Sequence, residues 1–217
     1  MHGIFVTGTD TGVGKSVLAA AICAALAARG ERVAALKPVV TGLDDPPGEW
    51  PHDHVLLAGA AGQAPEDVAP YRFGPPVSPH YAAELAGEAI EPARILAAAR
   101  AHDRLVCEGV GGLMVPITPG YLVRDLAVDL GLPVVIAART GLGTINHTLL
   151  TVEAARAAGL TVAGVVMTPW PSEPEPIERS NRKTVERLAG VPVHGLPPTD
   201  PDSLAAAGAT LPLCHWL

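Results

Sequence analysis

Short runs of apolar residues alternate along the chain with segments of helical periodicity. The runs predict strands at Ile4–Thr7, Val33–Lys37, Leu105–Cys107, Pro133–Ala138, Val162–Met167 and Val191–Gly195. The periodic segments predict helices at Ser16–Arg29, Pro92–Ala101, Val123–Leu130, Thr144–Ala158 and Ile177–Leu188. Because the strands are continuously apolar, we expect burial on both faces, as in a mostly parallel β-sheet flanked by helices. The pattern therefore predicts an α/β fold, with residues 1–217 as one domain.

The composition fits such a core and narrows the choice of partners. Hydrophobic residues make up 48% of the chain and aromatic residues only 4%, so small aliphatic side chains must fill the interior. The formal net charge of −7 argues against a general nucleic-acid-binding surface. Cys23 and Cys107 lie in apolar runs and are interpreted as buried thiols. The sequence shows neither a secretory signal nor an apolar stretch of membrane-spanning length, so we expect a cytoplasmic protein with no membrane partner.

The first predicted strand leads into the segment "VTGTDTGVGKS", Val6 to Ser16. Ligands of open α/β sheets bind at the carboxyl ends of the strands, so this segment is well placed to bind one. Gly12 and Gly14 allow a tight turn, and Lys15 and Ser16 are the residue types that contact nucleotide phosphates and Mg²⁺. The loop is one residue longer than the usual phosphate-binding loop. The strand before it and the long helix after it favour nucleotide binding over an ordinary glycine-rich turn.

Two further strand ends carry a charged side chain. Lys37 follows the second strand in "LKPVVTG" and is one of three lysines, beside 12 arginines. A compact ammonium group fits a crowded phosphate site better than a planar guanidinium group. Glu108 closes a buried strand in "CEGVGGLMVP", which is costly unless the carboxylate is paired or binds a hard cation such as Mg²⁺. The alternative interpretations are that Lys37 is an exposed lysine before a proline and that Glu108 is an ordinary loop carboxylate.

Asp53 and the segment around His147 are candidates with open alternatives. Asp53 precedes an apolar helical pattern and either binds metal or caps that helix. His52 and His54 flank it, but three consecutive side chains do not readily converge on one transition-metal ion. The segment "LGTINHTLL" begins a helix whose free N–H groups suit a second anion, such as a substrate carboxylate. His147 either takes part in that contact or is an ordinary helix residue.

Five segments together resemble the dethiobiotin synthetase family. They are "GTDTGVGKS", "KPVVTG", "PYRFGPPVSPH", "EGVGGLMVP" and "LGTINHTLL", which follow the family's order over most of the chain. The resemblance implies a P-loop NTPase fold, a homodimer, and the substrates ATP, CO₂ and 7,8-diaminononanoate with Mg²⁺ as cofactor. The implied reaction, a step of biotin synthesis, carboxylates one amine and activates the carbamate as a carbamic-phosphoric anhydride. It then closes a ureido ring and releases ADP and phosphate.

The resemblance also implies roles for individual residues. Lys15 and Lys37 are the expected catalytic cations, and Ser16, Asp53 and Glu108 are the expected Mg²⁺ ligands. Nucleotide contacts are expected from Gly12, Val13, Gly14, Lys15, Ser16, Val17, Asp53, Glu108, Gly109, Val110, Gly111, Thr168, Pro169, Pro197 and Pro198. Substrate contacts are expected from Thr11, Thr41, Gly111, Gly112, Leu113, Thr144, Asn146 and His147.

Two residues depart from the family pattern. Gly12 stands where many members have glutamate; we expect this to alter how the loop reports a bound substrate but to spare phosphate binding. Thr168 stands where the family often places an asparagine that reads the adenine base. A hydroxyl group offers a different hydrogen-bond pattern from an amide, so we expect relaxed base selectivity and use of nucleotides other than ATP.

Other functions remain open on the same scaffold. A partner-regulated nucleotide switch shares the fold, but Asp10 occupies the position where such proteins carry a signature lysine. An amide-forming ligase or amidotransferase usually requires a second, glutaminase domain with a catalytic cysteine, and this chain is short for two domains. A small-molecule kinase is the remaining enzyme alternative.

Overall fold

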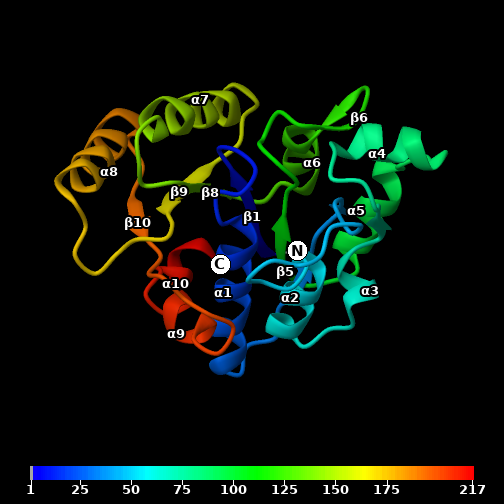
Figure 1. The fold of residues 1–217 in the computed structure, drawn as a ribbon, viewed down its shortest axis with the longest axis horizontal. Coiled ribbons are helices and arrows are strands. Elements are labelled where there is room, and N and C mark those ends of the chain that lie inside the picture. Colours follow the sequence, from blue (N-terminus) through cyan, green and yellow to red (C-terminus); the bar gives the residue numbers. More distant parts are fainter. Residues whose placement is uncertain (1) are drawn as a thin grey trace.

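Strand β1 (His2–Gly8) lies inside a sheet of six parallel strands in the order β10–β9–β8–β1–β5–β2 (Figure 1). The computed structural model describes residues 2–217. The other five strands of the sheet are β2 (Ala34–Leu36), β5 (Arg104–Glu108), β8 (Val134–Ala138), β9 (Val162–Met167) and β10 (Val193–Gly195). The predicted parallel sheet is confirmed, and the bounds of its strands agree with the sequence prediction to within two residues.

Helices cover both faces of this sheet. One face is covered by α1 (Lys15–Ala28), α2 (Asp53–Ala61), α3 (Pro65–Val68), α9 (Leu204–Gly208) and α10 (Leu213–Trp216). The opposite face is covered by α4 (Pro79–Ala86), α5 (Pro92–Arg100), α6 (Val123–Leu130), α7 (Thr144–Ala157) and α8 (Pro176–Ala189).

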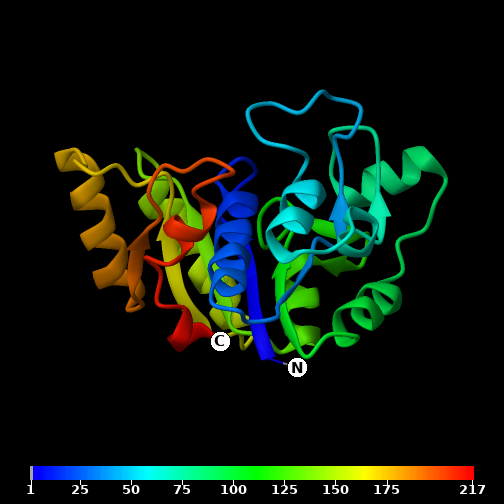
Figure 2. The same ribbon diagram turned by 90° about the horizontal axis from the view of Figure 1, so that it is seen from below.

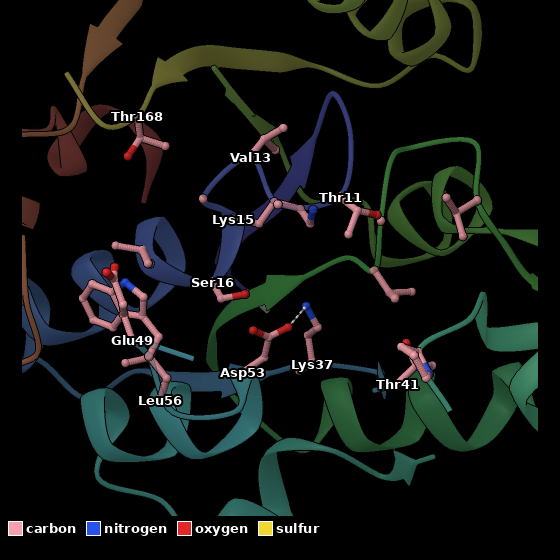
Figure 3. Close-up of a pocket in the computed structure, with 18 of the residues that line it drawn as sticks. Thr11, Val13, Lys15, Ser16, Lys37, Thr41, Glu49, Asp53, Leu56 and Thr168 are labelled. Atoms are coloured by element: carbon pink, nitrogen blue, oxygen red, sulfur yellow. Dashed lines mark ion pairs between the residues drawn. The ribbon is translucent and has the colours of Figure 1, made fainter. Parts of the chain in front are cut away.

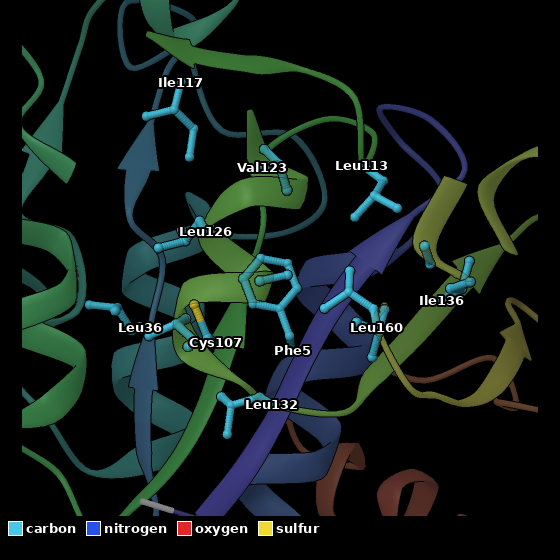
Figure 4. Close-up of a cluster of buried hydrophobic side chains, with 14 of the residues drawn as sticks. Phe5, Leu36, Cys107, Leu113, Ile117, Val123, Leu126, Leu132, Ile136 and Leu160 are labelled. Carbon is cyan, nitrogen blue, oxygen red and sulfur yellow. The ribbon is translucent and has the colours of Figure 1, made fainter. Parts of the chain in front are cut away.

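Alternate side chains of the strands enter the two resulting cores. In β1, Ile4 and Val6 pack with α1, whereas Phe5 packs with Leu126 of α6 on the other side (Figure 4). This alternation explains why the strands read as continuous apolar runs, because every position is buried on one face or the other.

Two small sheets were not expected from the sequence. Strands β3 (Val39–Val40) and β4 (Tyr71–Arg72) pair in parallel, and β6 (Pro116–Thr118) and β7 (Tyr121–Leu122) pair antiparallel. Strands of two or three residues are too short to show a period of their own. Helices α3, α9 and α10 have only four or five residues and were missed for the same reason. Helix α4 is as long as α6 and was also missed, although proline at the first turn of α3 and α4 is a recognisable start signal.

The order of the strands places β5 between β1 and β2, although β1 and β2 follow one another in the chain. Val6 of β1 aligns with Glu108 of β5, and Leu36 of β2 aligns with Cys107. Lys37, the residue after β2, therefore comes beside Glu108. The start of β1 and the C-terminus lie at the opposite end of the molecule from these strand ends (Figure 2). Among the helices of residues 2–217, none is long and apolar enough to cross a membrane.

Candidate nucleotide and substrate site

A pocket of about 870 Å³ opens at the carboxyl ends of the strands (Figure 3). The loop between β1 and α1 forms its middle, together with Lys37 after β2 and Asp53 at the start of α2. These are the strand ends and the helix start that the sequence singled out. The structure brings them together in one site.

The loop after β1 has the backbone of a phosphate-binding loop. Gly14 precedes α1 with φ 84°, a left-handed conformation that favours glycine. A Cβ atom at position 14 would also lie 2.6 Å from Cγ2 of Thr168, so this position has room only for glycine. Gly12 is left-handed as well, but open space surrounds it. The first N–H groups of α1 therefore face the pocket and offer positive potential to an anion.

Lys15 extends into this loop and is only 6% exposed. Its Nζ atom donates a hydrogen bond to the carbonyl oxygen of Asp10 at 2.8 Å, and Figure 3 shows it pointing toward Thr11. Burial, together with the nearby ammonium of Lys37, lowers the pKa of Lys15 to about 8. An anion that binds beside Lys15 would raise this pKa again, because the anion favours the protonated, charged form of the side chain.

The buried side chains of Lys37 and Glu108 form a cluster of polar groups with Ser16 and Asp53. The Nζ atom of Lys37 is 2.8 Å from Oδ2 of Asp53 and also pairs with Oε1 of Glu108. The hydroxyl of Ser16 donates to the same Glu108 oxygen at 2.8 Å. Glu108 is fully buried, and its other oxygen, Oε2, has no hydrogen-bond partner. A buried oxygen without a partner is costly, so this one is available to a further donor or cation.

The charges of the cluster stabilise one another. Burial alone would lower the pKa of Lys37, but the carboxylates of Asp53 and Glu108 outweigh it and raise the pKa. Burial would likewise raise the pKa of Asp53, whereas the Lys37 ammonium lowers it to about 2. Burial raises the pKa of Glu108 against the opposing effect of Lys37. Lys37 and Asp53 are thus charged at neutral pH.

The oxygen atoms of Ser16, Asp53 and Glu108 suit Mg²⁺. All are hard donors, they meet beside the phosphate-binding loop, and Oε2 of Glu108 lacks a partner. Within residues 2–217, no group of three or more histidine, cysteine and carboxylate side chains lies close enough to hold a metal.

The pocket has two ends. Figure 3 shows Thr11 and Thr41 at one end and Thr168 at the other, with Ser16 between them. Val110 and Gly111 line the pocket, as do Pro169, Pro197 and Pro198. The arrangement separates the expected substrate contacts from the expected nucleoside contacts.

Further residues line the pocket that were not expected from the sequence. They are Glu49, Trp50, Leu56, Pro76, Val77, Ser78, Pro79, Val115 and Thr199. Three of them, Glu49, Trp50 and Leu56, belong to the proline-rich loop after β3 and to α2. The sequence feature that could have indicated them is that their loop follows a strand whose carboxyl end lies at the site.

Seven expected site residues do not line this pocket. Gly109 lies against Phe5 and Val123, where a Cβ atom would clash, and Leu113 is buried in the core. Glu108 is fully buried and contacts the lining residues Lys37 and Ser16. The others are Gly112, Thr144, Asn146 and His147. Thr144 is buried and lies 3.4 Å, hydroxyl to hydroxyl, from Thr148. Asn146 and His147 are exposed at the start of α7, outside the pocket.

Comparison with known proteins identifies relatives along almost the whole chain. A family profile described as an AAA domain matches residues 2–206. An ATP-dependent dethiobiotin synthetase from Anaeromyxobacter dehalogenans is 44% identical over 208 residues, covering 93% of this chain and 92% of that protein. The ATP-dependent dethiobiotin synthetase from Bacillus subtilis strain 168 is 36% identical, covering 91% of this chain and 87% of that protein.

Solved structures share the fold at much lower identity. A ParA family ATPase from Chlorobium tepidum superposes with a TM-score of 0.55 at 13% identity, over 95% of this chain and 89% of that one. The MinC:MinD cell division complex from Aquifex aeolicus matches with a TM-score of 0.57 at 13% identity, over 95% and 86%. At this identity the likeness shows the fold alone, a P-loop NTPase type.

Proposed function

The chain belongs to the dethiobiotin synthetase family, and we propose that it makes dethiobiotin from 7,8-diaminononanoate, CO₂ and ATP. One amine of the diamine attacks CO₂ to form a carbamate. A carbamate oxygen attacks the γ-phosphorus of ATP, and ADP leaves. The second amine then attacks the carbamoyl carbon and expels phosphate, which closes the ureido ring. The observation that carries the proposal is the cluster of the buried Lys37 and Glu108 with Asp53 beside the phosphate-binding loop.

Positioning and charge stabilisation supply most of the catalysis in such a reaction. Negative charge collects on the carbamate and on the phosphoryl group during transfer. Lys15 and the N–H groups of α1 hold the phosphates from the loop side. Lys37 enters from the opposite side, and its buried ammonium faces the place where the carbamate and γ-phosphate meet.

Ser16, Asp53 and Glu108 are the residues that would hold Mg²⁺. When bound there, the ion would neutralise part of the negative charge on the phosphates. Asp53 is suited to this role because its side chain is 42% exposed toward the pocket while its partner Lys37 is buried. The carboxylate of Glu108 accepts a hydrogen bond from the hydroxyl of Ser16 and so fixes its position. These contacts pre-organise the oxygen donors before a nucleotide enters.

The end of the pocket near Thr11 and Thr41 would receive the diamine. Both side chains offer hydroxyl groups that hydrogen-bond to an amine or carbamate, and Gly111 allows close backbone approach. The opposite end, with Thr168, Pro169, Pro197 and Pro198, would receive the nucleoside. Threonine in place of asparagine supports relaxed base selectivity.

The start of α7 belongs to the proposal through a second copy of the chain. Thr144, Asn146 and His147 lie outside the pocket, but the free N–H groups there suit a substrate carboxylate. Leu142, in the loop just before α7, is 90% exposed, and Leu150, one turn after Asn146 on α7, is 61% exposed. Exposed leucines on both sides of the helix start mark a surface suited to an interface. The proposed homodimer of single-domain chains would bring this face to the partner's pocket.

The experiment that tests the function is phosphate release from ATP with Mg²⁺ and bicarbonate, with and without the diamine. A dethiobiotin synthetase releases phosphate only when the diamine is present. A nucleotide switch would hydrolyse ATP slowly without it, and a kinase would phosphorylate a substrate without using bicarbonate. Phosphate release independent of the diamine or of bicarbonate contradicts the proposal.

A further inference from the structure

One wall of the pocket contacts neither the expected phosphate position nor the expected substrate end. It consists of Glu49 and Trp50, from the loop between β3 and α2, and Leu56 of α2. Figure 3 shows Glu49 and Leu56 on the same side of the pocket as Thr168, with Thr11 and Thr41 on the far side. This wall therefore borders the nucleoside end, away from the expected substrate end.

The side chain of Trp50 lies between two cavities. It is half-buried against the apolar core on the α1 side of the sheet. It borders the main pocket and also a cavity of about 320 Å³ that is lined mostly by its own loop. An indole ring that lines an open pocket leaves apolar surface available to a planar ligand, and burial of aromatic surface is a strong contribution to binding.

The loop that carries these residues, Leu43–Pro51, is anchored only at its ends. Backbone N–H groups of Leu43 and Asp44 donate to the carbonyls of Phe73 and Gly74 at 3.2 and 2.9 Å. At the far end, α2 begins at Asp53. Among the described residues, none from 45 to 51 takes part in a hydrogen bond. Figure 2 shows this light-blue loop projecting from the body of the molecule above the strand ends.

We propose that Trp50 and Glu49 form the nucleoside-binding wall, with the indole packed on the base and the Glu49 carboxylate accepting hydrogen bonds from the ribose hydroxyls. The proposal rests on the ATP dependence proposed above. Ribose hydroxyls are donors that match an exposed carboxylate, and Glu49 has no ion-pair partner in the described part of the chain. Every nucleobase has a planar face, so stacking on an indole tolerates a change of base.

The two contacts predict different selectivity for the sugar and for the base. Loss of the ribose hydroxyls should weaken binding, because the carboxylate contact needs a hydroxyl group. A change of base should matter less, because the stacking contact needs only a planar ring. Proline-rich sequence on both sides of Trp50 restricts the unbound loop, which lowers the conformational entropy lost when the loop packs on a ligand.

Tryptophan fluorescence tests the stacking contact directly. The chain has three tryptophans, Trp50, Trp170 and Trp216. ADP with Mg²⁺ is expected to change the emission of the unmodified protein, whereas inorganic tripolyphosphate, which has no base, leaves it unchanged. Trp50→Phe should abolish the ADP response. The matched control Trp216→Phe should retain it, because Trp216 is 6% exposed in the core and lies outside the pocket.

Calorimetric titration tests the energetic contribution. Trp50→Ala is expected to weaken ADP binding about tenfold, the loss of one aromatic stacking contact, and to leave tripolyphosphate binding unchanged. Removal of both ribose hydroxyls, as in 2′,3′-dideoxy-ADP, should weaken binding to the unmodified protein severalfold. Glu49→Gln should reduce that difference. The control Asp45→Asn alters a carboxylate of the same loop that does not line the pocket, and should preserve it.

The outcomes separate this proposal from the proposed function. If ADP binds to Trp50→Ala as tightly as to the unmodified protein, the nucleoside wall is wrong while ATP dependence stands. If dideoxy-ADP and ADP bind equally to the unmodified protein, the role of Glu49 is wrong. If the unmodified protein binds neither ADP nor tripolyphosphate, the proposed function fails together with this inference.

Discussion

Lys37 illustrates how one residue joins the fold to the chemistry. It is 3% exposed, yet it carries a charge because Asp53 and Glu108 both contact its ammonium. A cation fixed in a buried site needs no reorganisation when negative charge develops nearby, and such fixed charges are worth more there than in water. The residue is thus placed to act on the carbamate and phosphoryl groups.

Replacement of this residue tests its role. Lys37→Ala is expected to lower the rate of ring closure at least about 100-fold while leaving ADP affinity within about threefold, because Lys15 and the α1 N–H groups still hold the phosphates. Single-turnover assays and ADP titration measure the two quantities. Lys183→Ala, an exposed lysine on α8, is the control and should match the unmodified protein. Full ring-closing activity in Lys37→Ala would remove Lys37 from the mechanism.

The lowered pKa of Lys15 predicts that the affinity for ADP depends on pH. Its pKa in the ligand-free protein is lowered to about 8, so the side chain loses its charge as the pH rises through that value. ADP affinity should therefore fall above about pH 8, approaching tenfold per pH unit, because binding must then restore the proton. Titrations from pH 7 to 9.5 measure this slope. In Lys15→Arg the guanidinium stays charged, so the slope should vanish; an equal slope there contradicts the assignment.

Thr168 predicts relaxed use of nucleotides. Its side chain packs against Gly14. Its hydroxyl donates and accepts through a single oxygen, whereas an asparagine amide presents a separate N–H donor and C=O acceptor side by side. We expect measurable ring closure with GTP, CTP and UTP as well as ATP. Comparison of kcat/KM over the four nucleotides checks this, and a strict ATP requirement would show that base reading lies elsewhere.

At the scale of elements, the packing of α9 on α1 depends on small residues. Gly208 ends α9, and a Cβ atom there would lie 2.0 Å from the carbonyl oxygen of Ala21 in α1. Gly208→Ala must therefore push the two helices apart, at a cost of about 1–3 kcal/mol in the free energy of unfolding.

A matched helix glycine gives the control for this prediction. Gly59 lies in α2 with open space around its Cα, so Gly59→Ala should be neutral or stabilise the fold by up to about 1 kcal/mol. Chemical denaturation of both variants measures the difference. Equal stabilities would mean that α9 adapts to the extra methyl group.

Elements with a full period could be predicted from sequence, and the short ones could not. The strands β8 and β9 and the helix α6 are long enough for their apolar positions to show a pattern. The pairs β3–β4 and β6–β7 are two or three residues long, and their form depends on neighbours distant in the chain.

The residues of the site likewise divide into those that the sequence indicates and those that it does not. Lys15, Ser16 and Lys37 follow strands and could be recognised, because strand ends meet at one edge of a parallel sheet. The direct pairing of Lys37 with Glu108 could not, since it requires β5 to lie between β1 and β2. Trp50 and Glu49 were missed because the proline-rich loop has no periodic pattern that indicates which way its side chains point.

At the scale of the whole molecule, the proposed dimer predicts a dependence on the exposed face of α7. Leu150→Glu is expected to convert a dimer to a monomer, because a charge in the centre of an apolar interface loses its hydration. Light scattering coupled to size-exclusion chromatography measures the mass. Leu188→Glu is the control, since Leu188 is exposed to a similar extent on α8 and should leave the mass unchanged. A monomeric unmodified protein would contradict the interface.

The most direct test of the central claim uses ¹³C-labelled bicarbonate. The protein is supplied with the diamine, ATP and Mg²⁺, and the products are followed by mass spectrometry and by NMR. The account predicts one labelled ureido carbon and one phosphate for each diamine consumed. Phosphate release without a labelled ring, as a kinase or a nucleotide switch would give, would contradict it.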